Sequence, residues 1–116
     1  MKLLADMNSD SKSIHAEIAI SPAGTGSTSM SKEVAAAFDA ISNLKDIKNV
    51  TLTAMGTQIE ASDMTHILKA IEVAHNAVRL TGVKRIITTI RIDERLDTSK
   101  TLQDNVESVK EKLPKR

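Results

Sequence analysis

Two kinds of hydrophobic spacing alternate along this chain of 116 residues. In residues 13–20 apolar side chains occupy every second position, which is the period of a strand with one buried face. Between residues 31 and 46 they recur every three to four positions, which is the period of an amphipathic helix. Because these changes of period fix the order of strands and helices, they limit the folds that the chain can adopt.

The order of the predicted elements is β-α-β-β-α-β followed by a C-terminal helix. They are a strand over 13–20, a helix over 31–46, strands over 49–55 and 57–61, a helix over 64–80, a strand over 84–93 and a final helix over 99–113. This is the order of an α+β, ferredoxin-like βαββαβ domain, in which an antiparallel sheet carries two helices on one face, plus a C-terminal helix. We expect a single domain over residues 13–116, preceded by a flexible N-terminal extension over residues 1–12.

The composition excludes several classes of site and partner. The chain has no cysteine, which excludes disulfides, thiolate nucleophiles and cysteine-bound zinc or iron–sulfur clusters. Phe38 is its one aromatic residue and the formal net charge is +1, which argues against base stacking and phosphate tracking on nucleic acids. No apolar run approaches the roughly 18 residues of a membrane span. We expect a cytoplasmic protein that binds neither nucleic acid nor membrane.

The histidines and serines provide neither a metal site nor a catalytic group. His66 and His75 are nine residues apart on one predicted helix and point to opposite sides, so they cannot share a metal ion. His15 lies on a strand without a matching ligand, and no serine has the surroundings of a nucleophile elbow. We therefore expect a protein without catalytic activity, metal or cofactor. An enzyme of the dimeric α+β barrel type would need a base such as His15.

Two helices can cover only one face of the predicted sheet. The other face would carry His15, Glu17, Ala19, Thr51, Thr53, Met55, Ile87, Thr89, Arg91 and Asp93. Because most of these residues are Thr, Ala, Ile and Met, they favour packing against a second copy of the chain. The alternative is that the last helix of the same chain folds over this face. In either arrangement Glu17, Arg91 and Asp93 would lose water and need polar partners, as groups that line ligand pockets do.

Three short segments have the residue types of a binding site, and each also has a simpler explanation. The loop over residues 21–29, SPAGTGSTS, leads into a helix N-terminus, where backbone N–H groups favour anions. Its spacing is not that of a P-loop or a dinucleotide fingerprint, and a capping loop explains it as well. In residues 55–60, MGTQIE, the simpler explanation is a β-bulge with an exposed glutamate. In residues 91–95, RIDER, it is a cluster of surface ion pairs.

Taken together and in order, longer segments around these motifs form a recognisable set. They are IAISPAGTGSTS (18–29), TAMGTQIE (53–60) and RIITTIRIDER (85–95). With them, the chain resembles the small thiamine-binding protein family over about residues 14–113. The resemblance implies a ferredoxin-like protomer that assembles through its sheets into dimers and tetramers. It also implies a non-catalytic function, which is the binding of thiamine or its hydroxymethylpyrimidine precursor.

The resemblance further implies a set of residues that line the ligand pocket. They are Glu17, Gly24, Thr25, Ser27 and Ser29 in and beside the first segment, Met55, Thr57 and Glu60 in the second, and Arg91 and Asp93 in the third. The carboxylates would accept hydrogen bonds from the exocyclic amine or offset the thiazolium charge, and hydroxyls would meet the ring nitrogens. Two other functions stay open at this point, a structural or regulatory interaction module whose sheet face serves only assembly, and an anion-binding protein.

Overall fold

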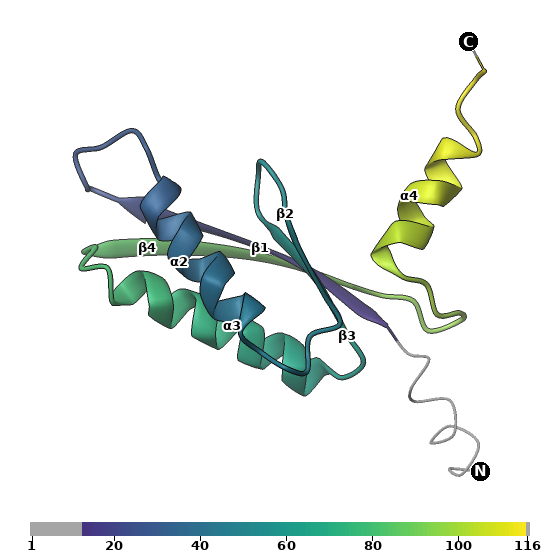
Figure 1. The fold of residues 1–116 in the computed structure, drawn as a ribbon, viewed down its shortest axis with the longest axis horizontal. Coiled ribbons are helices and arrows are strands. Elements are labelled where there is room, and N and C mark those ends of the chain that lie inside the picture. Colours follow the sequence, from purple (N-terminus) through teal and green to yellow (C-terminus); the bar gives the residue numbers. More distant parts are fainter. Residues whose placement is uncertain (1–12, 116) are drawn as a thin grey trace.

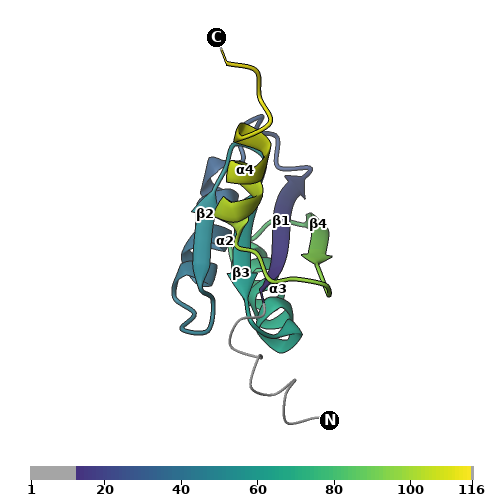
Figure 2. The same ribbon diagram turned by 90° about the vertical axis from the view of Figure 1, so that its right-hand side faces the viewer.

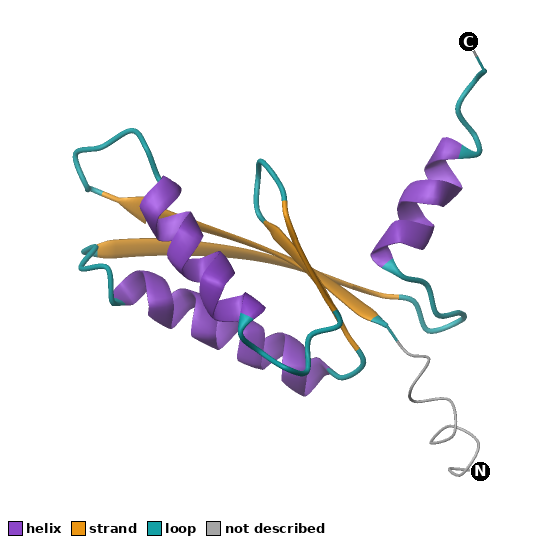
Figure 3. Cartoon of the chain, viewed as in Figure 1, coloured by secondary structure: helices purple, strands orange, loops and turns teal. Residues whose placement is uncertain are grey.

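The architecture is a single sheet with two helices on one face, and a computed structural model describes it for residues 13–115. The predicted N-terminal extension over residues 1–12 lies outside this range. The elements are β1 (Ile14–Ala23), α2 (Ser31–Ser42), β2 (Asn49–Leu52), β3 (Thr57–Ala61), α3 (Met64–Arg79), β4 (Arg85–Glu94) and α4 (Leu102–Lys110). The four strands form one antiparallel sheet in the order β2-β3-β1-β4, with α2 and α3 against the same face (Figures 1 and 3). The predicted α+β, ferredoxin-like fold is confirmed.

Strand register decides which side chains face the two helices. Glu17 of β1 pairs with Gln58 of β3 on one side and with Arg91 of β4 on the other. Directly paired residues point to the same face of a sheet, so these three side chains share the face that α2 and α3 leave uncovered. We call it the open face, and its paired residues include His15, Glu17, Ala19, Thr51, Gln58, Glu60, Ile87, Thr89, Arg91 and Asp93.

The core lies between the other face of the sheet and the two helices. Its largest fully buried side chains are Ile41 of α2, Ile59 of β3, and Ile67 and Val78 of α3. The first turn of α3 is capped by Asp63, whose carboxylate accepts a hydrogen bond from the Thr65 N–H at 3.1 Å. Phe38 is half-buried and lies outside the cluster of buried core residues. Aliphatic side chains therefore supply the core, as expected for a chain with one aromatic residue.

The predicted strand over 49–55 is too long, because Thr53 ends it. The Thr53 N–H donates to the Gly56 carbonyl at 2.9 Å, and the Thr53 hydroxyl accepts from the Gly56 N–H at 3.1 Å. These bonds close a tight turn between β2 and β3, so the predicted hairpin is confirmed. The placement of Thr53 and Met55 on the open face is wrong, because both residues lie in this turn.

Two other predicted boundaries also differ from the structure. β1 continues past residue 20 to Ala23, where Pro22 pairs with Ile86 of β4. Pro22 is tolerated there because the β3 side of β1 is paired only as far as Ile18, so no ladder bond needs its missing N–H. α2 ends at Ser42 rather than at residue 46, and the Ser42 hydroxyl donates to the Phe38 carbonyl at 2.8 Å.

α4 begins beside the open face and then leads away from the sheet (Figures 1 and 2). It contains no buried residue, and Val106 and Val109 on its apolar side are 47% and 61% exposed. Its start is defined by a capping box, in which Thr101 and Asp104 each bind the backbone N–H of the other. The alternative that the last helix folds over the open face therefore holds only for its first turns.

Candidate ligand-binding site

A pocket of about 150 Å³ lies on the open face, where β1, β3 and β4 meet the first turns of α4. We call it the open-face pocket. It is lined by His15, Ala16, Glu17, Gln58, Arg91, Asp93, Leu102 and Asn105. Three of the predicted ligand residues, Glu17, Arg91 and Asp93, are among them. The alternation of β1 and β4 brings these three together, because all have odd numbers in strands that pair in register.

Glu17 occupies the middle of this pocket. The Gln58 side-chain amide donates to Glu17 Oε2 at 3.1 Å, which orients the carboxylate across the sheet. Arg91 is the cross-strand neighbour of Glu17 on the other side. Its guanidinium forms no hydrogen bond or ion pair with another residue of the range 13–115. The pocket therefore combines an oriented carboxylate with an arginine whose donors are available to a ligand.

His15 joins the floor of the pocket to the segment that precedes α4. It is only 7% exposed, its Nε2 lies 2.6 Å from the Lys100 carbonyl, and its Nδ1 lies 3.3 Å from the Asn105 side-chain amide. Because a carbonyl can only accept, Nε2 carries the proton and Nδ1 accepts from Asn105. In this tautomer His15 is neutral, and it positions the Asn105 amide at the edge of the pocket.

Glu60 provides the second attachment of α4. Its side chain is 2% exposed, and its Oε1 accepts from the Leu102 N–H at 2.6 Å and from the Asn49 amide at 3.5 Å. A carboxylate is favourable there because the first N–H groups of a helix have no partner within the helix and carry partial positive charge. The simpler explanation of residues 55–60, with an exposed glutamate, is therefore wrong. A direct contact of Glu60 with a ligand stays a prediction.

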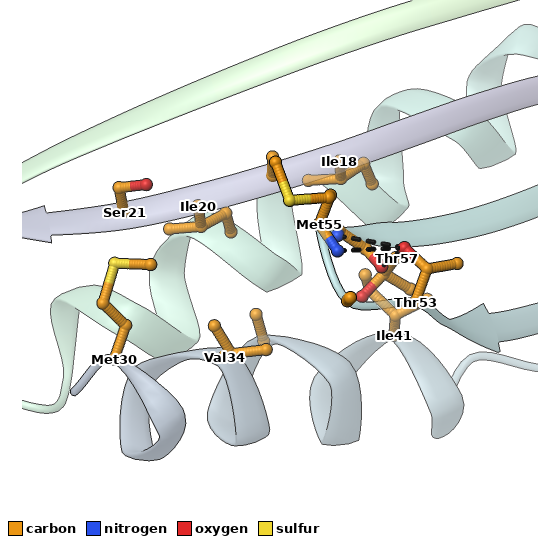
Figure 4. Close-up of a pocket in the computed structure, with 13 residues that line it drawn as sticks. Ile18, Ile20, Ser21, Met30, Val34, Ile41, Thr53, Met55 and Thr57 are labelled. Carbon is orange, nitrogen blue, oxygen red and sulfur yellow. Dashed lines mark hydrogen bonds between the residues drawn. The ribbon is translucent and has the colours of Figure 1, made fainter.

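Met55 and Thr57 lie elsewhere, in a pocket of about 80 Å³ between β1, α2 and the β2–β3 turn (Figure 4). Its walls include Met30, Val34 and Ile41, so it is mainly apolar. Met55 is 83% exposed, whereas Thr57 is buried on the helix-covered side of β3. The residues that line this pocket are all different from those that line the open-face pocket. These two predicted residues thus do not join Glu17.

Gly24, Thr25, Ser27 and Ser29 form a third group, in the exposed loop after β1. The Thr25 hydroxyl accepts from the Ser27 N–H at 3.2 Å, and the Ser27 hydroxyl accepts from the Ser29 N–H at 3.1 Å. The loop thus uses these hydroxyls to satisfy its own backbone, as the capping-loop explanation expects. Since Gly24 is seven residues of extended strand from Glu17, at about 3.3 Å each, the loop lies roughly 20 Å from the open-face pocket.

The described part of the chain offers no alternative centre for metal chemistry or membrane insertion. Within residues 13–115, no group of three or more metal-ligating side chains comes together. In the same range, no helix has the length and apolar character required to span a membrane.

Acidification is expected to loosen the first turn of α4. Hydrogen bonds from the Thr101 backbone and hydroxyl lower the pKa of Asp104 from its ordinary value of 3.8. A carboxylate with a lowered pKa stabilises the fold above its unfolded pKa, and this contribution disappears as the pH falls through the folded value. NMR should therefore show the Thr101 amide signal moving towards its unfolded position below pH 3.8. In Asp104→Asn the same signal should not respond over that range, and a response that persists would contradict the assignment.

Comparison with known proteins assigns the chain to a family. The thiamine-binding protein family matches residues 16–110. The chain belongs to this family. A UPF0045 protein of Methanothermobacter thermautotrophicus is 44% identical over 100 residues, which cover 86% of this chain and 99% of that protein. A UPF0045 protein of Bacillus subtilis is 33% identical over 100 residues, covering 84% and 95%.

Solved structures of similar fold agree with this assignment. The crystal structure of a hypothetical protein of Methanocaldococcus jannaschii superimposes with a TM-score of 0.75 at 36% identity, over 85% of this chain and 97% of that one. The crystal structure of a putative thiamine biosynthesis/salvage protein of Thermotoga maritima has a TM-score of 0.68 at 15% identity, over 84% and 98%. The latter likeness shows a shared fold. The part of the chain that matches the thiamine-binding protein family includes every residue of the open-face pocket except His15.

Sequence reasoning did not assign His15, Gln58 or Asn105 to the site. The alternation of residues 57–61 would have placed Gln58 on the same face as Glu60. Its contact with Glu17 could follow only from the β1–β3 register, which the alternation alone leaves undetermined. Asn105 had no usable signal, because its position depends on the path of the irregular segment between β4 and α4.

Proposed function

We propose that this chain binds thiamine, or its hydroxymethylpyrimidine precursor, without catalysis in the open-face pocket. The observation that carries the proposal is the convergence of Glu17, Arg91 and Asp93 on one pocket with the amides of Gln58 and Asn105. These residues lie within the segment that matches the thiamine-binding protein family. The name of the Thermotoga maritima protein of similar fold, which refers to thiamine biosynthesis or salvage, also supports it.

The chemistry of the pocket suits an aminopyrimidine. The exocyclic amine of this ring donates hydrogen bonds, and its ring nitrogens accept them. The Glu17 or Asp93 carboxylate would accept from the amine, while the Gln58 or Asn105 amide would donate to a ring nitrogen. The same two carboxylates would offset the positive charge of the thiazolium ring when thiamine is the ligand. The side chains thus cover both halves of the molecule.

We further propose that the open face packs against the open face of a second copy. A pocket of about 150 Å³ is smaller than the ~300 Å³ from which sites for small organic ligands begin, so one chain encloses only part of such a ligand. Sheets that pack face to face lie about 10 Å apart, which would close the pocket from above. Ile87, which is 49% exposed on the open face, would be buried in that arrangement.

Calorimetric titration tests the ligand and the site together. Purified protein should release heat with thiamine and with hydroxymethylpyrimidine. Glu17→Gln and Asp93→Asn should each weaken binding about tenfold or more, because a charge-assisted hydrogen bond contributes roughly 1.5–3 kcal/mol. Asp39→Asn is the matched control, since this exposed residue lies on α2, on the other side of the sheet.

The outcomes distinguish the proposed functions. Binding that both site variants leave unchanged would remove the open-face pocket as the site. An oligomer that gives no heat with either compound would favour the interaction module instead. Heat with inorganic phosphate alone, lost in Arg91→Gln, would favour the anion-binding protein, because the guanidinium is the group in the pocket suited to an anion.

A further inference from the structure

β4 is an edge strand that is long and lacks the usual protection. It extends over ten residues, Arg85–Glu94, and within the described sheet it pairs only with β1. It contains no proline, and its side towards α3 borders a groove of about 530 Å³. Ile90 and Ile92 on that side are 38% and 43% exposed. Native proteins rarely leave such an edge uncovered, because its free N–H and C=O groups pair readily with another strand.

We propose that β4 pairs edge to edge with β4 of a second copy of this chain. The two strands are antiparallel and are related by a two-fold axis that passes through Thr89, perpendicular to the sheet. The two sheets then form one continuous sheet, with the helices of both copies on the same face. This interface uses the edge of the sheet rather than its open face, so it goes beyond the proposed ligand-binding function and does not depend on it.

The register follows from the charges of the strand itself. With the axis at Thr89, Arg85 lies opposite the partner's Asp93, and Lys84 lies opposite the partner's Glu94. Each of these ion pairs occurs twice, because the interface is symmetric. On the helix-covered face the same register places Ile86 opposite the partner's Ile92, so the exposed isoleucines lie against apolar neighbours.

The neighbouring registers are unfavourable. A perpendicular two-fold axis preserves the faces of the sheet, so it must pass through a residue of the strand and not between two residues. With the axis at Thr88, Arg85 would lie opposite the partner's Arg91. With the axis at Ile90, it would lie opposite the partner's Arg95. Like charges directly opposite each other destabilise a strand pair, so Thr89 is the favoured centre.

The groove between α3 and β4 agrees with this arrangement. It is lined by Ile71, His75 and Arg79 of α3 and by Thr88 and Ile90 of β4, among others. Since both copies carry their helices on the same face, α3 of the partner would lie across the junction from α3 of the first copy. The pair of helices would cover the isoleucines that a single chain leaves half exposed.

A single-cysteine variant tests the register directly, because the chain has no cysteine of its own. In Thr89→Cys the two thiols would face each other across the axis. Directly opposite residues in antiparallel strands have Cα atoms about 4.5–5.5 Å apart, which is within disulfide range. Mild oxidation should therefore convert most of the protein to a covalent dimer on a non-reducing gel. Face-to-face packing cannot produce this result, because stacked sheets lie about 10 Å apart.

Two further variants serve as controls for the crosslink. Thr51→Cys places an exposed thiol on the same face but on β2, at the opposite edge of the sheet. Ile87→Cys places one on β4, where it would lie opposite the partner's Arg91 rather than opposite itself. Neither should crosslink. A Thr89→Cys protein that stays uncrosslinked, or crosslinks no better than the two controls, would overturn the proposal.

Charge exchange provides a second, independent test. Lys84→Glu/Arg85→Glu makes the charges of the edge entirely acidic, and Asp93→Lys/Glu94→Lys makes them entirely basic. Each variant alone should associate at least about tenfold more weakly than the original chain, and an equimolar mixture should restore the dimer in sedimentation velocity. Lys45→Glu/Lys112→Glu carries the first charge change away from the edge and should associate normally. If the mixture fails to associate while each variant keeps its circular dichroism spectrum, the register is wrong.

Discussion

Replacing Glu60 with alanine is expected to release the N-terminal end of α4 and to lower the free energy of unfolding by about 1–3 kcal/mol. The Glu60 carboxylate is buried and accepts the Leu102 N–H at 2.6 Å, which connects α4 to β3 across 42 residues of sequence. Its loss leaves that N–H without its acceptor. Hydrogen–deuterium exchange should be faster at Leu102 and at the residues that follow it.

Two controls separate the hydrogen bond from the charge. Glu60→Gln keeps an acceptor at the same place and should preserve most of the protection at Leu102. Glu107→Ala removes an exposed carboxylate from α4 and should change neither exchange nor stability appreciably. Exchange at Leu102 that is the same in Glu60→Ala as in the original chain would show that other contacts hold α4.

The second large effect concerns the layer beneath the site. Ile59→Ala is expected to lower the free energy of unfolding by about 2–5 kcal/mol, because it leaves a cavity in a fully buried position. Ile59 pairs with Ala16 of β1 and Val50 of β2 and belongs to the central core cluster. Urea denaturation followed by circular dichroism measures the change.

A surface residue gives the comparison for this substitution. Leu80→Ala removes a similar volume from a side chain that is 86% exposed, so its effect should stay within about 0.5 kcal/mol. A loss in Ile59→Ala no larger than that in Leu80→Ala would mean that the packing around β3 is not as described.

The period of the hydrophobic residues was sufficient to predict the fold and the face on which part of the site lies. Glu17, Arg91 and Asp93 share the open face because a strand alternates its side chains strictly, and this rule needs no tertiary information. Alternation failed at Thr53 and Met55, where the pattern continues but the chain turns. There the Thr53 hydroxyl closes a turn with Gly56, and such local bonding has no counterpart in hydrophobic spacing.

The composition of the site could be predicted only in part. The resemblance pointed to ten residues along three segments, and the structure separates them into the open-face pocket with adjoining Glu60, the pocket beside α2, and the loop after β1. The contacts that complete the first group join His15 to Lys100 and Glu60 to Leu102. They depend on how an irregular segment of seven residues, 95–101, returns to the sheet, and no local pattern encodes that path.

The unequal edges of the sheet have a consequence for how the molecule can aggregate. β4 offers ten residues for pairing, whereas β2 at the other edge has only four, Asn49–Leu52, and ends in a tight turn. A sheet with two long free edges can add copies indefinitely and grow into a fibril. Here growth through the long edge stops after one addition, because the joined sheet exposes only two short ends. The chain is thereby protected from runaway polymerisation by the brevity of one strand.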